Sequence, residues 1–194
     1  MITTTLNRIR DHSPCSYGWK RLLIGLGKTQ ADDEPLPFAD IVAINGLGDA
    51  LWCCRAEPQH AKEWRLYAVW CCRQVEHLML DPRSRSAIDI AERHAHGLAT
   101  DTDLSAARAA ARAAAEDAAG SEAGDAVTYG NLAAYAAISS AYAEAWEAAF
   151  DGSSSTARIA AWNAPGAWDA AWDAAWDAAR AAQKTEFLRI VGEN

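Results

Sequence analysis

Two short segments of the chain place a tryptophan, two cysteines and an arginine in the same order. They are Trp52-Cys53-Cys54-Arg55 and Trp70-Cys71-Cys72-Arg73. An arginine three residues after a tryptophan lies on adjacent helical surface, where its guanidinium can stack on the indole ring. Such a pair suits an anionic or aromatic ligand, for example a nucleotide. The alternative is a duplicated helix-packing element whose arginines reach the surface. We predict a ligand-binding site that comprises Trp52, Arg55, Arg65, Tyr67, Trp70, Arg73 and His77.

The two cysteine pairs also suggest a metal site, which we do not expect here. Zinc sites are tetrahedral and commonly have two residues between paired cysteines. Adjacent cysteines on a helix instead point about 100° apart and do not easily share one ion. We therefore predict no metal and no cofactor, and we interpret all five cysteines as reduced thiols of a cytoplasmic protein.

A second candidate site is the repeat Trp-Asp-Ala-Ala, which begins at Trp168, Trp172 and Trp176. A period of four drifts only about 40° per repeat on an α-helix, so the tryptophans form one stripe and the aspartates a neighbouring one. We predict a partner-binding surface on this helix, formed by Asp169, Trp172, Asp173 and Asp177. The alternative is a solvated acidic face beside a tryptophan-packed core, in which Asp177 pairs with Arg180.

No combination of residues indicates catalysis. The segment Asp11-His12-Ser13-Pro14-Cys15 holds acid, base and nucleophile types, but catalytic triads draw their residues from distant segments. Ser13 before Pro14 instead predicts a helix N-cap. The chain has no phosphate-binding loop, dinucleotide fingerprint or zinc-protease motif. We expect a protein that is not an enzyme.

Composition excludes further classes of function. Residues 1–100 have 12 Lys/Arg and 12 Asp/Glu, whereas residues 101–194 have 6 and 14, so the second part carries the whole net charge of −8. The lack of a basic excess argues against a nucleic-acid partner. No apolar stretch reaches the roughly 18–20 residues of a membrane span. Alanine is in excess, with 45 residues, of which 34 follow residue 100.

The positions of caps, prolines and glycines predict an all-α protein of about eight helices with an alanine-rich, tryptophan-filled core and no sheet. We expect one domain over residues 1–194, with sub-regions 1–97 and 98–194. The serine run 153–155 is predicted to be a loop or cap. The longer helices are expected at residues 14–26, 59–80, 82–95, 101–119, 126–150 and 167–191.

Several segments resemble a bacterial and phage family of immunity proteins, namely Asp11–Cys15, Ala31–Pro37 and Asn45–Trp52. Further segments resemble an element that recurs widely in bacterial proteins, namely Arg65–Arg73, His77–Met79, Asp81–Arg85, Ala91–Arg93 and Gly97–Arg112. Together the resemblance covers roughly residues 11–119. It implies a non-catalytic protein that neutralises a toxin or defence effector, and it identifies no catalytic residue.

These observations leave several functions open. We expect a binding protein of bacterial or phage conflict whose target is a protein effector. One alternative is the sequestration of a nucleotide-derived immune signal by the Trp/Arg segments. Another is a structural, oligomerising helical protein. A homodimer is possible if the tryptophans after residue 160 are exposed.

Overall fold

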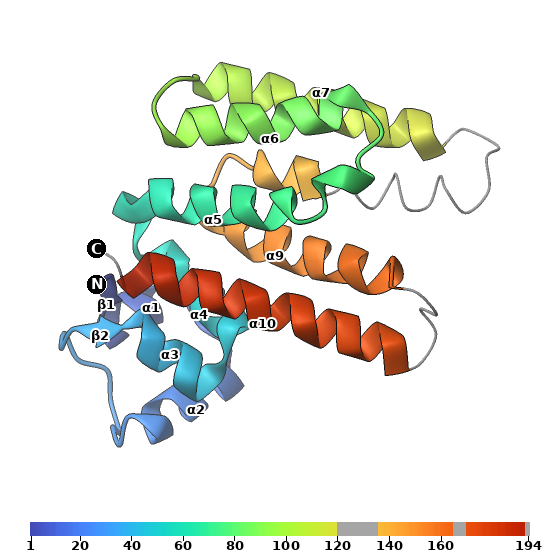
Figure 1. Cartoon of the computed structure of the whole chain (residues 1–194). Coiled ribbons are helices and arrows are strands. Elements are labelled where there is room, and N and C mark those ends of the chain that lie inside the picture. The colour runs from blue at the N-terminus through green and yellow to red at the C-terminus, as the bar shows by residue number, and fades with distance from the viewer. Residues whose placement is uncertain (120–135, 165–169, 193–194) are drawn as a thin grey trace. The chain divides into compact units, whose positions relative to one another are not determined.

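The computed structural model of the chain describes residues 1–119, 136–164 and 170–192 (Figure 1). These ranges are almost entirely helical, which confirms the predicted all-α class. The chain divides into two compact units: unit 1 is Met1–His60 with Lys184–Asn194, and unit 2 is Ala61–Gln183. This division does not coincide with the change in composition near residue 97.

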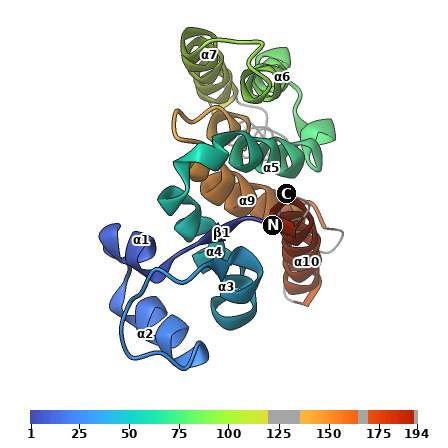
Figure 2. The same cartoon turned by 90° about the vertical axis from the view of Figure 1, so that its left-hand side faces the viewer.

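Unit 1 is built from short helices. Its elements are β1 (Thr3–Thr4), α1 (Leu6–Asp11), α2 (Ser16–Gly25), β2 (Leu36–Pro37), α3 (Phe38–Asn45), α4 (Leu47–Cys53) and the 3₁₀ turns η1 (Cys54–Ala56) and η2 (Pro58–His60). Helix α3 contacts both α2 and α4 (Figure 2). The last residues of the chain complete the unit, because the backbone N–H of Ile2 donates to the carbonyl of Val191 over 2.7 Å. The rings of Phe38 and Phe187 meet edge to face, with centroids 6.1 Å apart.

Two local features of unit 1 differ from the prediction. Strands β1 and β2 form an antiparallel pair of two residues each, which is too short to show alternation in the sequence. Helix α2 is capped by Cys15, whose Sγ accepts a hydrogen bond from the backbone N–H of Gly18, and not by Ser13. Ser13 has a positive φ of 54° and lies in the turn before the helix.

Unit 2 is built from longer helices. Its elements are α5 (Ala61–Arg73), η3 (Glu76–Leu78), α6 (Pro82–Ala95), α7 (Asp101–Ala119), a helical segment at 136–140, α9 (Ala145–Trp162) and the part of α10 (Ala170–Gly192) up to Gln183. Helix α5 contacts α9 and α6, and α6 contacts α7, so these helices follow one another in the order α9, α5, α6, α7 (Figure 1). The predicted helices at 82–95, 101–119 and 167–191 correspond to α6, α7 and α10.

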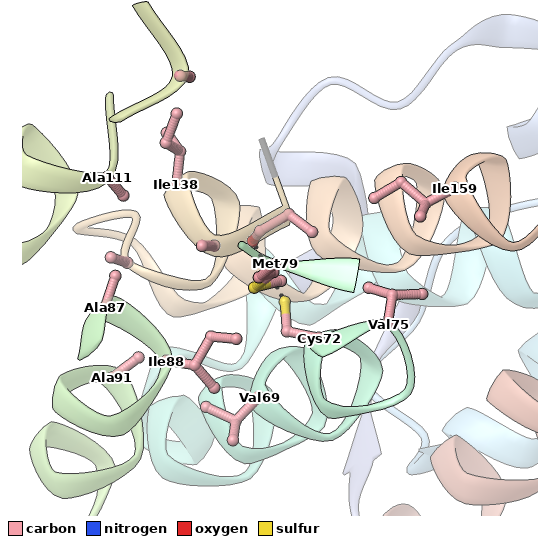
Figure 3. Packing of buried hydrophobic residues seen from close by; sticks show 14 of the residues in the cluster. Val69, Cys72, Val75, Met79, Ala87, Ile88, Ala91, Ala111, Ile138 and Ile159 are labelled. Atoms are coloured by element: carbon pink, nitrogen blue, oxygen red, sulfur yellow. Dashed lines mark hydrogen bonds between the residues drawn. The ribbon is translucent and has the colours of Figure 1, made fainter. Parts of the chain in front are cut away.

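The core of unit 2 is aliphatic and rich in alanine. Val69 and Cys72 of α5 lie near Ile88 of α6, with Ile138 and Ile159 in the same cluster (Figure 3). Tryptophan contributes less than expected. Among the described tryptophans, Trp64 is buried, whereas Trp19, Trp52, Trp70, Trp146, Trp162, Trp172 and Trp176 are half-buried.

The predicted helix at 59–80 is shorter in the structure. It begins at Ala61 and ends at Arg73. After Cys72, the backbone N–H groups of Gln74 and Val75 bond to carbonyls three residues earlier, which tightens the chain into a turn. His77 therefore does not continue the face of α5.

The predicted helix at 126–150 is also interrupted. The segment 136–140 ends in a turn, and α9 begins at Ala145; residues 126–135 lie outside the described part of the chain. The serine run 153–155 is helical and not a loop, since it lies within α9. Ser153 and Thr156 satisfy their hydroxyl groups by donating to carbonyls of the preceding turn. Of the helices that the structure describes, none is long and apolar enough to cross a membrane.

Candidate functional site

The first Trp/Arg segment has the predicted geometry. The guanidinium carbon of Arg55 lies 4.1 Å from the centroid of the Trp52 ring. Its Nε donates to the backbone carbonyl of Trp52 over 3.1 Å, which orients the guanidinium. Both side chains are half-buried. A cation held on an indole face at the surface of unit 1 is therefore present, as the spacing of three residues predicted.

The arginine of the second segment is already occupied by carboxylates. Arg73 donates to Glu76 over 2.8 Å and to Asp89 and Glu92 over 2.7 Å each. Burial lowers the pKa of Arg73, but the hydrogen bonds to these carboxylates raise it more, so the net pKa lies above its ordinary value. With three anionic neighbours, this guanidinium joins α5 to α6 and does not present a free positive charge to a ligand.

Arg65 has an internal role. Its guanidinium donates to the backbone carbonyls of Ser140 over 3.1 Å and Ala143 over 2.8 Å. Burial lowers its pKa to about 10, while the charges of Asp101 and Glu144 act in the opposite direction. Arg65 therefore satisfies carbonyls that the break between residue 140 and α9 leaves without helical N–H partners.

The remaining predicted ligand residues differ in exposure. Tyr67 is fully buried in unit 2, Trp70 is half-buried, and His77 is exposed in the turn after α5. Trp52 and Arg55 belong to unit 1, whereas the other five residues belong to unit 2. Within unit 2, Arg65 and Arg73 are both engaged by internal partners.

The first turns of α10 carry the second candidate surface. The rings of Trp172 and Trp176 stack with centroids 5.6 Å apart and an interplanar angle of 8°. Both rings are half-buried, and the neighbouring Asp173 and Asp177 are exposed, with no ion pair to another described residue. We call these four residues the acidic aromatic face of α10. Trp168 and Asp169 lie outside the described residues.

The predicted pairing of Asp177 with Arg180 is wrong. The Arg180 guanidinium donates instead to the Ser153 hydroxyl over 3.2 Å and to Gln183 Oε1 over 2.9 Å. The Gln183 amide in turn donates to the carbonyl of Ser153 and the hydroxyl of Thr156. This network joins α10 to α9 inside unit 2 and leaves the aspartates facing water.

A third surface was missed by the sequence reasoning. In α2 the side chains of Tyr17 and Ile24 are 77% and 67% exposed, and Lys20 and Arg21 between them are also exposed. Tyr17 and Ile24 are seven residues apart, so they lie about 20° apart around the helix. This face could have been found in the sequence, because the two apolar residues flank the basic pair at a spacing that places all four on one side of a helix. We call these four residues the basic apolar face of α2.

The cysteines are free thiols, and four of them are buried. Burial raises the pKa of Cys53 and of Cys72 to about 12, and it raises that of Cys54 well above 9.0. These thiols are therefore protonated at neutral pH and are poor nucleophiles. Within the described ranges, no three His, Cys, Asp or Glu side chains gather in a way that would hold a metal ion.

Comparison with known proteins adds no relative: the chain matches no family model, no curated protein and no solved structure.

Proposed function

We propose that this chain is a non-catalytic binding protein of bacterial or phage conflict, and that it neutralises a protein effector by binding it. The observation that carries the proposal is the acidic aromatic face of α10, where two stacked, half-buried indoles lie beside two exposed aspartates that form no ion pair with any residue the structure describes. Stacked tryptophans offer a large, rigid contact area, and tryptophan is enriched at the centres of protein interfaces. The flanking carboxylates favour a target with a basic surface.

The sequence resemblance over residues 11–119 supports the biological setting of this proposal. The engagement of Arg65 and Arg73 by internal partners favours a protein target over a nucleotide. A nucleotide site needs cations that are available for phosphate groups, and these two guanidiniums are already satisfied.

A selection in bacteria tests the proposal. The chain is expressed together with a library of cloned toxin and defence-effector genes, and clones that survive induction are recovered. We expect rescue from at least one effector, which then copurifies with the chain. No rescue across the library would contradict the proposal.

Two variants connect the rescue to α10. Trp172→Ala/Trp176→Ala should lower the affinity for the recovered effector by about 30-fold, because two aromatic anchors contribute about 2 kcal/mol or more. The matched control Asp33→Asn/Asp40→Asn removes two exposed carboxylates of unit 1 and should retain the rescue. Rescue that survives the tryptophan changes would place the binding surface elsewhere.

The second candidate is the sequestration of a nucleotide-derived signal, which the stacking of Arg55 on Trp52 favours. Thermal unfolding of the purified chain with cyclic nucleotides and ADP-ribose derivatives distinguishes the two candidates. A ligand present at about 100 times its Kd adds roughly 2.7 kcal/mol to the stability of the folded state, so a signal binder gives a clear upward shift of Tm. We expect no shift across this panel.

A further inference from the structure

Two helical faces of this chain carry exposed charges of opposite sign. The basic apolar face of α2 consists of Tyr17, Lys20, Arg21 and Ile24, and the acidic aromatic face of α10 consists of Trp172, Trp176, Asp173 and Asp177. Each face therefore joins two formal charges of one sign to two large apolar side chains. Complementary faces of this kind steer association and fix its register.

The charges on both faces lack partners in the structure. Lys20 and Arg21 make no ion pair to another described residue, and the same holds for Asp173 and Asp177. By contrast, the half-buried Lys28 of the same unit is held by Asp32 and Glu34 at 2.6 and 2.7 Å. The four unpaired charges are thus available to an incoming surface.

The chain also uses the contact chemistry that such an association needs. Arg55 stacks on Trp52, and Arg108 stacks on the ring of Tyr142 at the same distance of 4.1 Å. Arg21 or Lys20 placed against the Trp172–Trp176 stack would make a contact of the same type, with the aspartates beside it as counter-charges. The small alanines exposed next to the aspartates, Ala174 and Ala178, let a second helix approach closely.

We infer that the chain self-associates, with the basic apolar face of α2 on one copy seated on the acidic aromatic face of α10 on another copy. A contact between two α10 faces is disfavoured, because it would bring four carboxylates together. Each copy carries one face of each kind, so the contact joins different surfaces of the two copies and is heterologous. Repetition of this contact either closes into a ring or produces chains that lengthen as the protein concentration rises. This inference goes beyond the proposed function and is tested without any effector.

The test is a charge exchange between two variants. Lys20→Glu/Arg21→Glu has two acidic faces, and Asp173→Lys/Asp177→Lys has two basic faces. The molar mass of the wild type and of each variant is measured by sedimentation over a range of concentrations in about 0.1 M NaCl. In about 1 M NaCl the Debye length falls from about 10 Å to about 3 Å, so the contribution of the exposed charges is largely screened.

We expect the wild-type mass to rise above the single-chain value of 20.9 kDa with concentration and to fall again in high salt. Each variant alone should stay at the single-chain mass, and an equimolar mixture of the two should associate, because each face then meets its opposite. The control Asp33→Lys/Asp40→Lys changes the net charge as much as the α10 variant does, and it should associate like the wild type. All changed side chains are exposed, and circular dichroism verifies that each variant is folded.

Three results would overturn the inference. The wild type could stay at the single-chain mass at all concentrations, a variant alone could still associate, or the mixture of the two variants could fail to associate. The last result would mean that the two faces are not each other's binding partners.

Discussion

At the scale of single residues, Arg65 shows how this fold accommodates a buried cation. Its guanidinium is 2% exposed and donates to two backbone carbonyls. The negative ends of these two carbonyl dipoles face the guanidinium and stabilise its charge. Burial acts in the opposite direction and lowers the pKa of Arg65 to about 10.

The first prediction concerns this contact. Arg65→Met should lower the free energy of unfolding by about 2–3 kcal/mol, because the buried carbonyl of Ser140 and the partly buried carbonyl of Ala143 lose charged donors. The cost of burying the cation also disappears, which limits the loss. Urea unfolding measures the change. Arg112→Met is the matched control, since the Arg112 side chain is 74% exposed and its Nε lies 3.8 Å from Glu116 Oε1. This substitution should change the free energy of unfolding by no more than about 0.5 kcal/mol. Equal effects of the two changes would contradict the structural role of Arg65.

The second prediction concerns pH and the buried thiols. Burial raises the pKa of Cys53 and Cys72 from 9.0 to about 12 in the folded chain. The unfolded chain releases these protons at lower pH than the folded chain, so their contribution to stability is complete below pH 9 and is lost between pH 9 and 12. The slope approaches about 1.4 kcal/mol per pH unit for each thiol.

Urea unfolding at pH 8 and pH 10 measures this loss. The wild type should lose more stability over the interval than Cys53→Ala/Cys72→Ala, in which these two thiols are absent. An identical pH dependence of the two proteins would show that the thiols do not cause the loss.

At the scale of elements, local signals predicted some helices well and tertiary contacts decided the others. Helix α6 matches its predicted bounds because Asp81 caps it and Pro82 opens it, and α7 begins with reciprocal hydrogen bonds between Thr100 and Asp103. Near residue 140, backbone carbonyls accept hydrogen bonds from Arg65, which is distant in sequence, and Arg73 at the end of α5 donates to Asp89 and Glu92 of α6. A sequence pattern contains no information about those partners.

The same distinction applies to the candidate sites. The stacking of Arg55 on Trp52 follows from a spacing of three residues, which is a local property. The ion pairs of Arg73 with Asp89 and Glu92 were not predictable, because these carboxylates belong to another helix. The exposure of the aspartates on α10 was predicted as one alternative, but the direction of Arg180 depends on Ser153 of α9.

The third prediction compares the same substitution in two helices. A Cβ at Gly152 of α9 would lie 3.7 Å from the Cβ of Ala68 in ordinary contact, whereas a Cβ at Gly25 of α2 would overlap the Cγ2 methyl of Ile44. Gly152→Ala should therefore stabilise the protein by about 0.5–1 kcal/mol through helix propensity. Gly25→Ala should destabilise it by about 1–3 kcal/mol through overpacking.

Thermal or urea unfolding of both variants decides this comparison. A destabilising Gly152→Ala would mean that α5 and α9 pack more closely than the structure describes. If Gly25→Ala left the free energy of unfolding unchanged, the Ile44 side chain would be able to move away from the added methyl group without loss of stability.

At the scale of the whole molecule, the charge belongs mainly to one unit. Unit 1 has 8 Lys/Arg and 9 Asp/Glu, whereas unit 2 has 10 and 17, so unit 2 carries −7 of the net −8. The exposed aspartates of α10 are part of this excess, while the exposed pair Lys20 and Arg21 belongs to unit 1. If the target is basic, as we propose, its binding to this acidic unit should weaken as salt rises.

The central claim is that the acidic aromatic face of α10 binds a basic protein effector, and calorimetric titration of the effector recovered by selection tests it most directly. The effector is titrated into the wild type and into Asp173→Lys/Asp177→Lys at about 0.1 M and 0.5 M NaCl. The account predicts a Kd at least about tenfold higher for the variant at low salt, since like charges then face each other, and a smaller effect of salt on the variant than on the wild type. Equal Kd values for the two proteins at both salt concentrations would contradict it.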